Sequence, residues 1–351
     1  MTSPKRIILA TDTYYPQVNG VSKSLQETRE VLEGLGHEVA LIGPDKTMPN
    51  PIYPQIPMPI PSPKKVVTLF EEFKPDHIHI ATEGPIGILT RSHCVDRNLK
   101  FTTSFHTLWP EYLSKLMLVP SSLTWNSLWW FHSAAELTMT RSKSMMEILR
   151  QKGFQKVAEW TGSYDPNCFY QRERKDNTSK RPIYLYIGRV SVEKNLEAFL
   201  NLDLGDGTKR IVGDGPYLQT LKAKYPEVEF LGEKSGEELA QAYCEGDVFV
   251  FPSLTDTFGR VVVEALASGV PVAAFPVTGP KDILASPQLG AMHDDLRVAI
   301  EEALRHGDRY ECARYATKFS KEKVAEQFLK NLVPVKEAGK DTTAREQHPT
   351  N

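Results

Sequence analysis

Residues 251–269 read FPSLTDTFGRVVVEALASG, and this segment gives the clearest indication of the architecture. A β-rich run ends at Phe251, a turn follows, and an apolar helix is predicted to begin near Gly259. The free amides of a helix N-terminus and the positive end of its dipole attract anions. We therefore expect an anion site suited to a diphosphate, formed by the amides of Thr257, Phe258, Gly259 and Arg260.

Two carboxylates lie close to this predicted helix start. Asp256 precedes the helix, and Glu264 lies about one turn inside it. Carboxylates in such places can accept hydrogen bonds from the hydroxyls of a sugar. A plainer interpretation is that Asp256 caps the helix and Glu264 pairs with a neighbour. The spacing alone leaves both interpretations open.

The same strand, turn and helix pattern recurs on both sides of this segment. After a polar stretch at 171–181, β-rich runs alternate with helical segments, at 183–188, 209–213, 228–232, 247–251 and 270–274. Before that stretch the β-rich runs lie at 6–10, 38–43, 77–81, 101–105, 136–140 and 156–160. The alternation is typical of parallel sheets covered by helices. It predicts two α/β, Rossmann-like domains, with ligands bound outside the carboxyl ends of the strands, in a cleft between the domains.

The expected domain limits follow from this pattern. The first domain is predicted at 1–165, a linker at 166–182 and the second domain at 183–316. A C-terminal helix at 317–335 is expected to cross back onto the first domain, and a flexible polar tail follows at 336–351.

The composition excludes several classes of protein. The 351 residues include 42 Lys and Arg and 44 Asp and Glu, a net charge of -2, so no nucleic acid partner is expected. Cysteines stand far apart, without a CxxC motif, at Cys94, Cys168, Cys244 and Cys312. This spacing predicts neither a structural metal site nor a redox dithiol. The N-terminus has no signal-peptide pattern, and we expect a cytoplasmic protein.

Two glycine-containing loops follow strands of the second half. In IGRVSVEKN, residues 187–195, Arg189 and Lys194 could clamp a diphosphate, although two loop cations could equally be solvated. In the second loop, VGDGP, Gly213 and Gly215 follow a strand. Glycine suits a tight turn there with or without a ligand.

The first half contributes two further candidates. His106 ends the β-rich run of SFHT, and a histidine at that end of a strand can face a ligand or serve only the structure. Gly20 follows the first run, in the segment Asn19-Gly20-Val21, where glycine would allow a ligand to approach closely.

Taken in this order, the segments resemble the family 4 retaining glycosyltransferases of GT-B architecture. The similarity runs from about Lys5 to Leu332 and rests on TDTYYPQVNGV, HIHIATEGPIG, TSFHT, GRVSVEKN, VGDGP and PSLTDTFGRVVVEALASGVPVAA. The details look most like short bacterial enzymes that glycosylate lipids. These are glycosyl-diacylglycerol synthases, sulfoquinovosyl-diacylglycerol synthases and phosphatidylinositol mannosyltransferases.

The resemblance implies a role for each candidate in the second half. Arg189 and Lys194 would hold the donor diphosphate, and Glu264 would accept from the ribose hydroxyls. Asp256, with the Phe258 and Gly259 amides, would hold the transferred sugar. The family usually has Glu where Asp256 stands, so the sugar contact is expected to differ. No metal or other cofactor is expected, because the two cations and the helix amides can neutralise the leaving group.

In the first half, the resemblance places His106 near the reacting face of the sugar. Gly20 would let the first loop close on the phosphates. Residues 160–165 read WTGSYD, without the arginine that the family often has there and with the glycine displaced. The implied reaction is the transfer of a hexosyl unit, with retention of configuration, from a nucleotide sugar of the UDP-glucose or UDP-glucuronate type. The implied acceptor is a membrane lipid hydroxyl such as that of diacylglycerol.

An uncharged window at 116–135 supports a lipid acceptor. It is too interrupted by polar residues to span a membrane. Its aromatic side chains suit shallow insertion into a bilayer surface, and they are Trp125, Trp129, Trp130 and Phe131. A core helix with buried aromatics is the competing interpretation. We expect peripheral association with the cytoplasmic face of a membrane.

Three alternatives stay open from the sequence. One is a GDP-mannose-dependent α-mannosyltransferase that acts on phosphatidylinositol or a glycan. Another is a GT-B epimerase or phosphorylase, of which a phosphorylase would need a lysine-bound pyridoxal cofactor. The third is a non-catalytic protein of the same fold that only binds a nucleotide sugar.

Overall fold

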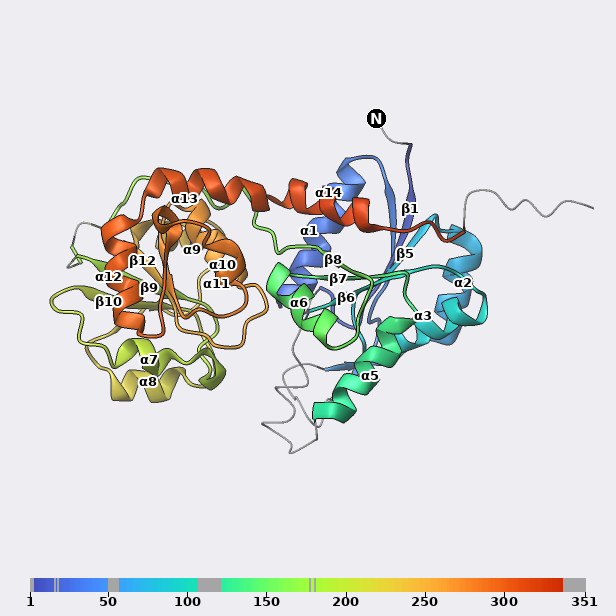
Figure 1. Cartoon of the computed structure of the whole chain (residues 1–351), viewed down its shortest axis with the longest axis horizontal. Helices are drawn as coiled ribbons and strands as arrows, with labels where there is room; N and C mark the ends of the chain where they lie inside the picture. The colour runs from blue at the N-terminus through green and yellow to red at the C-terminus, as the bar shows by residue number, and fades with distance from the viewer. Residues whose placement is uncertain are drawn as a thin grey trace, which may run out of the picture.

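The computed structural model of the chain describes residues 3–336, except residues 16, 18, 50–56, 107–120, 177 and 180. Figure 1 shows two lobes, each built around one sheet with helices against it. All strand pairs within the two six-stranded sheets are parallel. The predicted fold class, two parallel α/β domains, is therefore confirmed.

The first sheet has the strand order β2-β1-β5-β6-β7-β8. Its strands are β1 (Arg6–Ala10), β2 (Glu38–Ile42), β5 (His77–Ile80), β6 (Thr102–Phe105), β7 (Leu137–Thr140) and β8 (Val157–Glu159). A separate antiparallel pair is formed by β3 (Thr47–Met48) and β4 (Met58–Pro59). The helices of this lobe are α1 (Gly20–Gly34), α2 (Pro63–Phe73), α3 (Pro85–Asp96), α5 (Ser121–Ser133) and α6 (Lys143–Gln151).

The second sheet has the strand order β11-β10-β9-β12-β13-β14. Its strands are β9 (Ile183–Ile187), β10 (Thr208–Val212), β11 (Glu229–Phe230), β12 (Val248–Phe251), β13 (Val272–Ala274) and β14 (Gly290–Met292). The first α-helices of this lobe are α7 (Leu196–Leu200), α8 (Leu218–Lys224), α9 (Gly236–Glu245), α10 (Arg260–Ala267) and α11 (Pro280–Ile283). Further along the chain come α12 (Leu296–His306) and α13 (Arg309–Ala316). Three short 3₁₀ turns are η1 (Val192–Lys194), η2 (Pro287–Leu289) and η3 (Thr317–Phe319).

Both sheets reverse their strand order near the middle, and this fixes where a ligand can bind. The chain winds outward in one direction from β1 and β9, then returns to continue on their other side at β5 and β12. In open parallel sheets, ligands bind outside the carboxyl ends of the strands at this switch point. The loops after β9 and β12 are therefore the expected binding loops of the second lobe. The loops after β1 and β5 hold that position in the first lobe.

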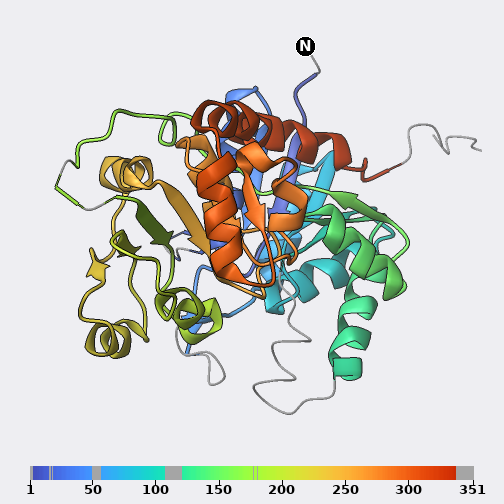
Figure 2. The same ribbon diagram turned by 60° about the vertical axis from the view of Figure 1, so that its left-hand side comes forward.

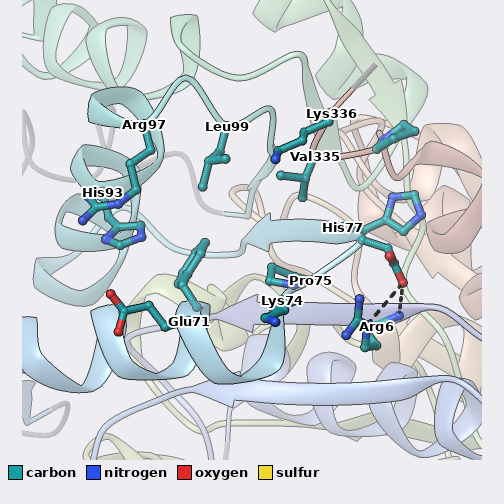
Figure 3. Close-up of a pocket in the computed structure, with 13 residues that line it drawn as sticks. Arg6, Glu71, Lys74, Pro75, His77, His93, Arg97, Leu99, Val335 and Lys336 are labelled. Carbon is teal, nitrogen blue, oxygen red and sulfur yellow. Dashed lines mark hydrogen bonds and ion pairs between the residues drawn. The ribbon is translucent and has the colours of Figure 1, made fainter. Parts of the chain in front are cut away.

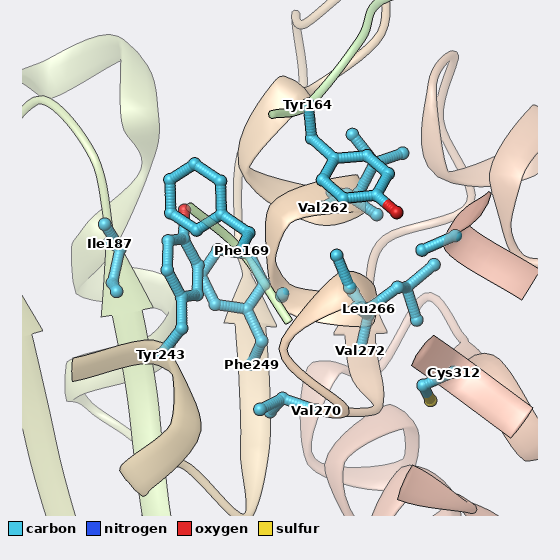
Figure 4. Packing of buried hydrophobic residues seen from close by; sticks show 14 of the residues in the cluster. Tyr164, Phe169, Ile187, Tyr243, Phe249, Val262, Leu266, Val270, Val272 and Cys312 are labelled. Atoms are coloured by element: carbon cyan, nitrogen blue, oxygen red, sulfur yellow. The ribbon is translucent and has the colours of Figure 1, made fainter. Parts of the chain in front are cut away.

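Aromatic and aliphatic side chains fill one side of the second sheet, where α9 and α10 pack against it. Figure 4 shows Tyr243 of α9 beside Phe169 and Phe249, with Val262 and Leu266 of α10 close by. The Tyr243 and Phe169 rings meet edge to face, with their centroids 5.5 Å apart. Because these side chains are almost completely buried, the helices that carry site residues are held rigidly against the sheet.

The last helix, α14 (Lys321–Asn331), links the two lobes. In Figures 1 and 2 the chain leaves α13 at the second lobe and α14 lies along the first. Val324 and Phe328 of α14 pack with Leu25 of α1 and with Trp160, in one buried cluster. The prediction that a C-terminal helix packs back on the first domain is therefore confirmed, while the exact domain limits stay a prediction.

Candidate active site at the facing strand ends

Lys194 and Asp256 meet at the switch point of the second sheet. The Lys194 Nζ lies 2.8 Å from each carboxylate oxygen of Asp256, and each side chain is 24% exposed. Asn195 holds the two loops together, because its side-chain amide donates to the carbonyl of Pro252 over 3.1 Å. We expected separate roles for these two residues, and the structure brings them together as an ion pair.

The segment between Asp256 and α10 turns sharply at Gly259, the N-cap residue of the helix. Gly259 has φ +80°, a left-handed conformation that favours glycine. The ring of Phe258 is buried, and a Cβ on Gly162 would lie only 2.3 Å from it. The displaced glycine of segment 160–165 therefore makes room for Phe258. The N-cap residue of α10 is Gly259, and no side chain of the described residues caps the helix, so the interpretation of Asp256 as a helix cap is wrong.

Arg189 occupies the loop after β9 with an exposed side chain. Its backbone carbonyl accepts a hydrogen bond from the Tyr186 hydroxyl at 2.8 Å, which fixes the loop and leaves the guanidinium in solvent. Gly213 and Gly215 follow β10 and pack closely against the loop that carries Arg189. A Cβ on Gly213 would lie 1.9 Å from the Gly188 carbonyl oxygen, and both glycines have positive φ. Their observed role is thus to let two loops pack closely, which places Arg189.

Glu264 is a buried residue of α10, and its carboxylate already interacts with neighbouring side chains. The Tyr243 hydroxyl donates to Oε2 at 2.9 Å. Lys23 Nζ and a nitrogen of Arg260 lie 3.7 and 3.9 Å from Oε1. The interpretation that Glu264 pairs with a neighbour is therefore what this structure shows. Burial and the nearby Glu264 carboxylate raise the pKa of Tyr243 well above its usual range, so Tyr243 stays a hydrogen-bond donor.

His106 lies at the end of β6, opposite the second lobe. The Thr257 hydroxyl donates to the His106 carbonyl oxygen at 2.9 Å, so the loop before α10 touches the residue directly. The imidazole is buried; its Nδ1 accepts a hydrogen bond from Arg141 Nε over 3.0 Å. Within the described residues, Nε2 has no hydrogen-bond partner. Sequence reasoning found His106 and missed Arg141.

Gly20 begins α1, close in sequence to Asn19, which caps that helix. The Asn19 side chain accepts from the amides of Val21 and Ser22. A Cβ on Gly20 would meet nothing within 4 Å, so the space beside it is open. Gly20 is consistent with an approach site for a ligand, while its own conformation does not require glycine.

A second interdomain contact was not foreseen. Arg260, the first residue of α10, forms a bidentate ion pair with Glu27 of α1 at 2.7 and 2.9 Å. Ser163 donates to the same carboxylate at 2.7 Å. The two residues lie 233 positions apart in the sequence, so no local pattern could have linked them. The two lobes touch at these points instead of standing apart.

Helix α5 divides the four predicted acceptor or membrane residues into two pairs. Trp125 and Phe131 are buried at 8% and 2% exposure and belong to the hydrophobic core, which corrects the prediction for these two. Trp129 and Trp130 are 51% and 48% exposed. Arg91 of α3 stacks on the Trp130 ring, with its guanidinium carbon 3.9 Å from the ring centroid. Residues 116–120 of the uncharged window lie outside the described part of the chain.

A cavity of about 560 Å³ lies elsewhere, at the amino ends of β1 and β5. Figure 3 shows Arg6, His77 and Arg97 among its lining side chains. Two of its cations, Lys74 and Arg97, are the C-cap residues of α2 and α3, where a positive charge offsets the negative end of the helix dipole. Because ligands of such sheets bind at the carboxyl ends, we do not assign the donor site to this cavity.

The described residues contain neither a cluster of metal-ligating side chains nor a membrane-spanning helix. Among them, no group of three or more His, Cys, Asp or Glu side chains is arranged to hold a metal ion. Metal independence stays a prediction. No helix in that part of the chain is long and apolar enough to cross a membrane.

Comparison with known proteins identifies the family and agrees with the fold. The family described as Glycosyltransferase Family 4 matches residues 18–161, and Glycosyl transferases group 1 matches residues 181–306. The GDP-mannose-dependent alpha-mannosyltransferase of Mycolicibacterium smegmatis is 30% identical over 331 residues, covering 86% of this chain and 88% of that protein. The chain therefore belongs to glycosyltransferase family 4.

Two further similarities extend this result. The alpha-monoglucosyldiacylglycerol synthase of Streptococcus pneumoniae is 29% identical over 346 residues, covering 85% of this chain and 78% of that protein. The structure of sucrose-phosphate synthase from Thermosynechococcus elongatus superposes with a TM-score of 0.73 at 19% identity, covering 93% and 98% of the two chains. The predicted family and the predicted GT-B fold are confirmed.

Proposed function

We propose that this protein is a retaining glycosyltransferase that moves a hexosyl unit from a nucleotide sugar to the hydroxyl of a membrane lipid. The observation that carries the proposal is the meeting of Lys194, Asp256 and the start of α10 opposite His106. Cations and a helix N-terminus suit a diphosphate leaving group, and a carboxylate with a buried imidazole suits the hydroxyls of a sugar.

On the donor side, we expect the cations to bind the diphosphate and the carboxylates to bind hydroxyl groups. The exposed guanidinium of Arg189 and the ammonium of Lys194 would stabilise the negative charge that develops on the departing diphosphate. Lys194 is paired with Asp256 in this structure. When the donor binds, the Lys194 ammonium would contact the diphosphate as well as, or instead of, Asp256. The Asp256 carboxylate would then accept a hydrogen bond from a sugar hydroxyl. Glu264, oriented by Tyr243, would present its other oxygen to the ribose.

On the acceptor side, α5 favours a lipid. Helix α5 contains no Asp, Glu, Lys or Arg residue. Three large apolar side chains are exposed on it, and they are Leu123, Trp129 and Trp130. Exposed Trp and Leu on such a helix suit the interface of a bilayer. The relative from Streptococcus pneumoniae is named as an alpha-monoglucosyldiacylglycerol synthase, which supports glucosyl transfer to diacylglycerol. We propose a nucleotide sugar of the UDP-glucose or UDP-glucuronate type as donor. We further propose peripheral attachment to the cytoplasmic face of a membrane.

One second candidate has specific support. The relative from Mycolicibacterium smegmatis is named as GDP-mannose-dependent, so mannosyl transfer to phosphatidylinositol or a glycan is the alternative. Both candidates use the same diphosphate contacts and differ in the base, the sugar and the acceptor.

The test is a matrix of donors and acceptors with the purified full-length chain. UDP-glucose, UDP-glucuronate and GDP-mannose are each combined with vesicles containing diacylglycerol or phosphatidylinositol, and labelled lipid is measured. We expect one UDP-sugar to label diacylglycerol, with the α configuration retained when the product is examined by NMR. Labelled lipid with GDP-mannose alone would favour the second candidate. No transfer with any combination, together with tight donor binding, would contradict catalysis.

A further inference from the structure

The imidazole of His106 is hydrogen-bonded through one ring nitrogen, and its other nitrogen has no partner among the described residues. Its Nδ1 lies 3.0 Å from Arg141 Nε, which donates the hydrogen bond. Its Nε2 is buried and has no partner among the described residues. The residue as a whole is 9% exposed. One ring nitrogen is thus committed to the protein, and the other is a buried polar atom without a partner in the described part of the chain.

Arg141 is itself fixed in place. Its NH1 donates to the carbonyl oxygens of Trp160 and Thr161 at 3.4 and 3.0 Å. Its guanidinium carbon lies 4.1 Å from the centroid of the Trp160 ring. Burial and the charge of Arg260 lower the pKa of Arg141 to about 9, which keeps it protonated at neutral pH. A fixed, protonated arginine can only donate.

This arrangement determines where the imidazole proton lies. A ring nitrogen that accepts a hydrogen bond carries no proton, and the neutral ring then has its proton on the other nitrogen. We propose that Arg141 is a positioning residue that holds His106 as the neutral Nε2–H tautomer. His106 then donates a hydrogen bond to an oxygen of the bound sugar and accepts no proton during transfer. The identity of that oxygen as a sugar oxygen rests on the proposed function.

The surrounding groups act in the same direction. Burial lowers the pKa of His106 well below its usual range, and the charge of Arg141 lowers it further, followed by His79 and His132. The opposite lobe contributes the Thr257 hydroxyl, which contacts the His106 carbonyl and carries no charge. The Glu27 carboxylate acts on Arg141, where it favours the protonated guanidinium. Each effect keeps His106 neutral.

An unpaired, buried N–H is costly unless a ligand completes it. We therefore interpret the Nε2–H of His106 as a donor that forms its hydrogen bond when substrate binds. A histidine serving as a base would instead need an unprotonated nitrogen in that position. The tautomer separates these two roles, and it can be measured without knowing the substrate.

The first experiment is ¹⁵N NMR of the histidine side chains in the full-length, ligand-free chain. The His106 signals are assigned by their loss in His106→Asn. We expect the neutral Nε2–H pattern, unchanged between pH 5 and pH 8. A protonated Nδ1, or an imidazolium that titrates in this range, would overturn the proposal whatever the enzyme transfers.

The second experiment removes the donor to Nδ1. In Arg141→Leu we expect a mixture of both tautomers and a raised His106 pKa, since the lost positive charge no longer opposes protonation. Arg141→Lys, which keeps a charged donor, is expected to restore the Nε2–H form. The matched control is Arg91→Leu, because Arg91 is also a buried arginine that donates to two carbonyls and stacks on a tryptophan. We expect the control to leave the His106 signals unchanged.

Activity then links the tautomer to the reaction. With the donor and acceptor identified by the matrix, turnover should fall about tenfold or more in Arg141→Leu and recover in part in Arg141→Lys. A changed tautomer with unchanged turnover would show that Arg141 has only a structural role. If Arg141→Leu does not fold, the wild-type spectrum still decides the central claim. A wild-type Nε2–H spectrum with no transferase activity would contradict the proposed function and leave the tautomer intact.

Discussion

At the scale of single residues, substitution of Lys194 gives the most direct test of the proposed diphosphate site. It is the cation nearest to Asp256, and its loss removes a preorganised charge from the site. We expect Lys194→Ala to lower turnover about tenfold or more, because the departing diphosphate loses a stabilising charge. The measurement is transfer at saturating donor.

The control for Lys194 is Lys224→Ala, which removes a lysine of the same lobe from an ion pair with Glu197. That lysine is 48% exposed, and pairs of this kind contribute little. Turnover in Lys194→Ala equal to that of the control would show that Lys194 does not hold the leaving group.

Two glycines make a second residue-scale prediction. Gly213→Ala should destabilise the fold strongly, because its Cβ would collide with the Gly188 carbonyl and its φ is +141°. Gly20→Ala should keep or slightly raise the melting temperature, since the first turn of a helix accepts alanine and the space is open. Lower transfer by a stable Gly20→Ala protein would support a ligand beside Gly20. Full activity would contradict that role.

At the residue scale, the sequence singles out a candidate where a motif marks it. Lys194, Asp256 and Glu264 stand in recognisable segments, whereas Arg141 stands in none. The only signal for Arg141 was an arginine directly after β7, the strand beside β6, which ends just before His106. The Lys194–Asp256 pair joins positions 62 residues apart, and only the sheet order brings them together.

At the scale of elements, α5 combines a core face and an exposed face. The sequence indicated an uncharged segment rich in aromatics, with a core helix as one of two interpretations, but the four rings alone do not show which side faces the core. The structure buries Trp125, Leu128 and Phe131, which recur at three-residue spacing, and leaves Trp129 and Trp130 outside. The exposed pair is the surface that the membrane proposal uses.

The α5 surface predicts a change in vesicle binding without a change in charge. In flotation with vesicles of phosphatidylglycerol and phosphatidylcholine, the double variant Trp129→Ser/Trp130→Ser should bind several-fold less than wild type, because interfacial aromatic area is lost. Tyr310→Ser is the control, since Tyr310 is 69% exposed on the other lobe. Wild type that stays wholly in the soluble fraction would count against membrane attachment.

At the scale of the whole molecule, the two lobes are joined by charge as well as by α14. The Glu27–Arg260 pair has side chains only 10% and 13% exposed, and two serines, Ser24 and Ser163, also contact it. Removing one partner of such a pair leaves the other charge buried and unpaired. This pair therefore favours the arrangement in which His106 and Thr257 touch.

We expect Glu27→Gln to weaken this arrangement by about 3 to 5 kcal/mol, because Arg260 then lacks its counter-charge. Small-angle X-ray scattering should report a larger radius of gyration, and the melting temperature should fall. The matched control on the same helix is Glu33→Gln, whose surface pair with Arg29 is expected to contribute less than about 1 kcal/mol. In Glu27→Gln/Arg260→Met the loss should be partly recovered, since an uncharged pair leaves no buried charge without a partner. A single variant as compact and as stable as the control would show that the lobes are held together by α14 and the remaining contacts alone.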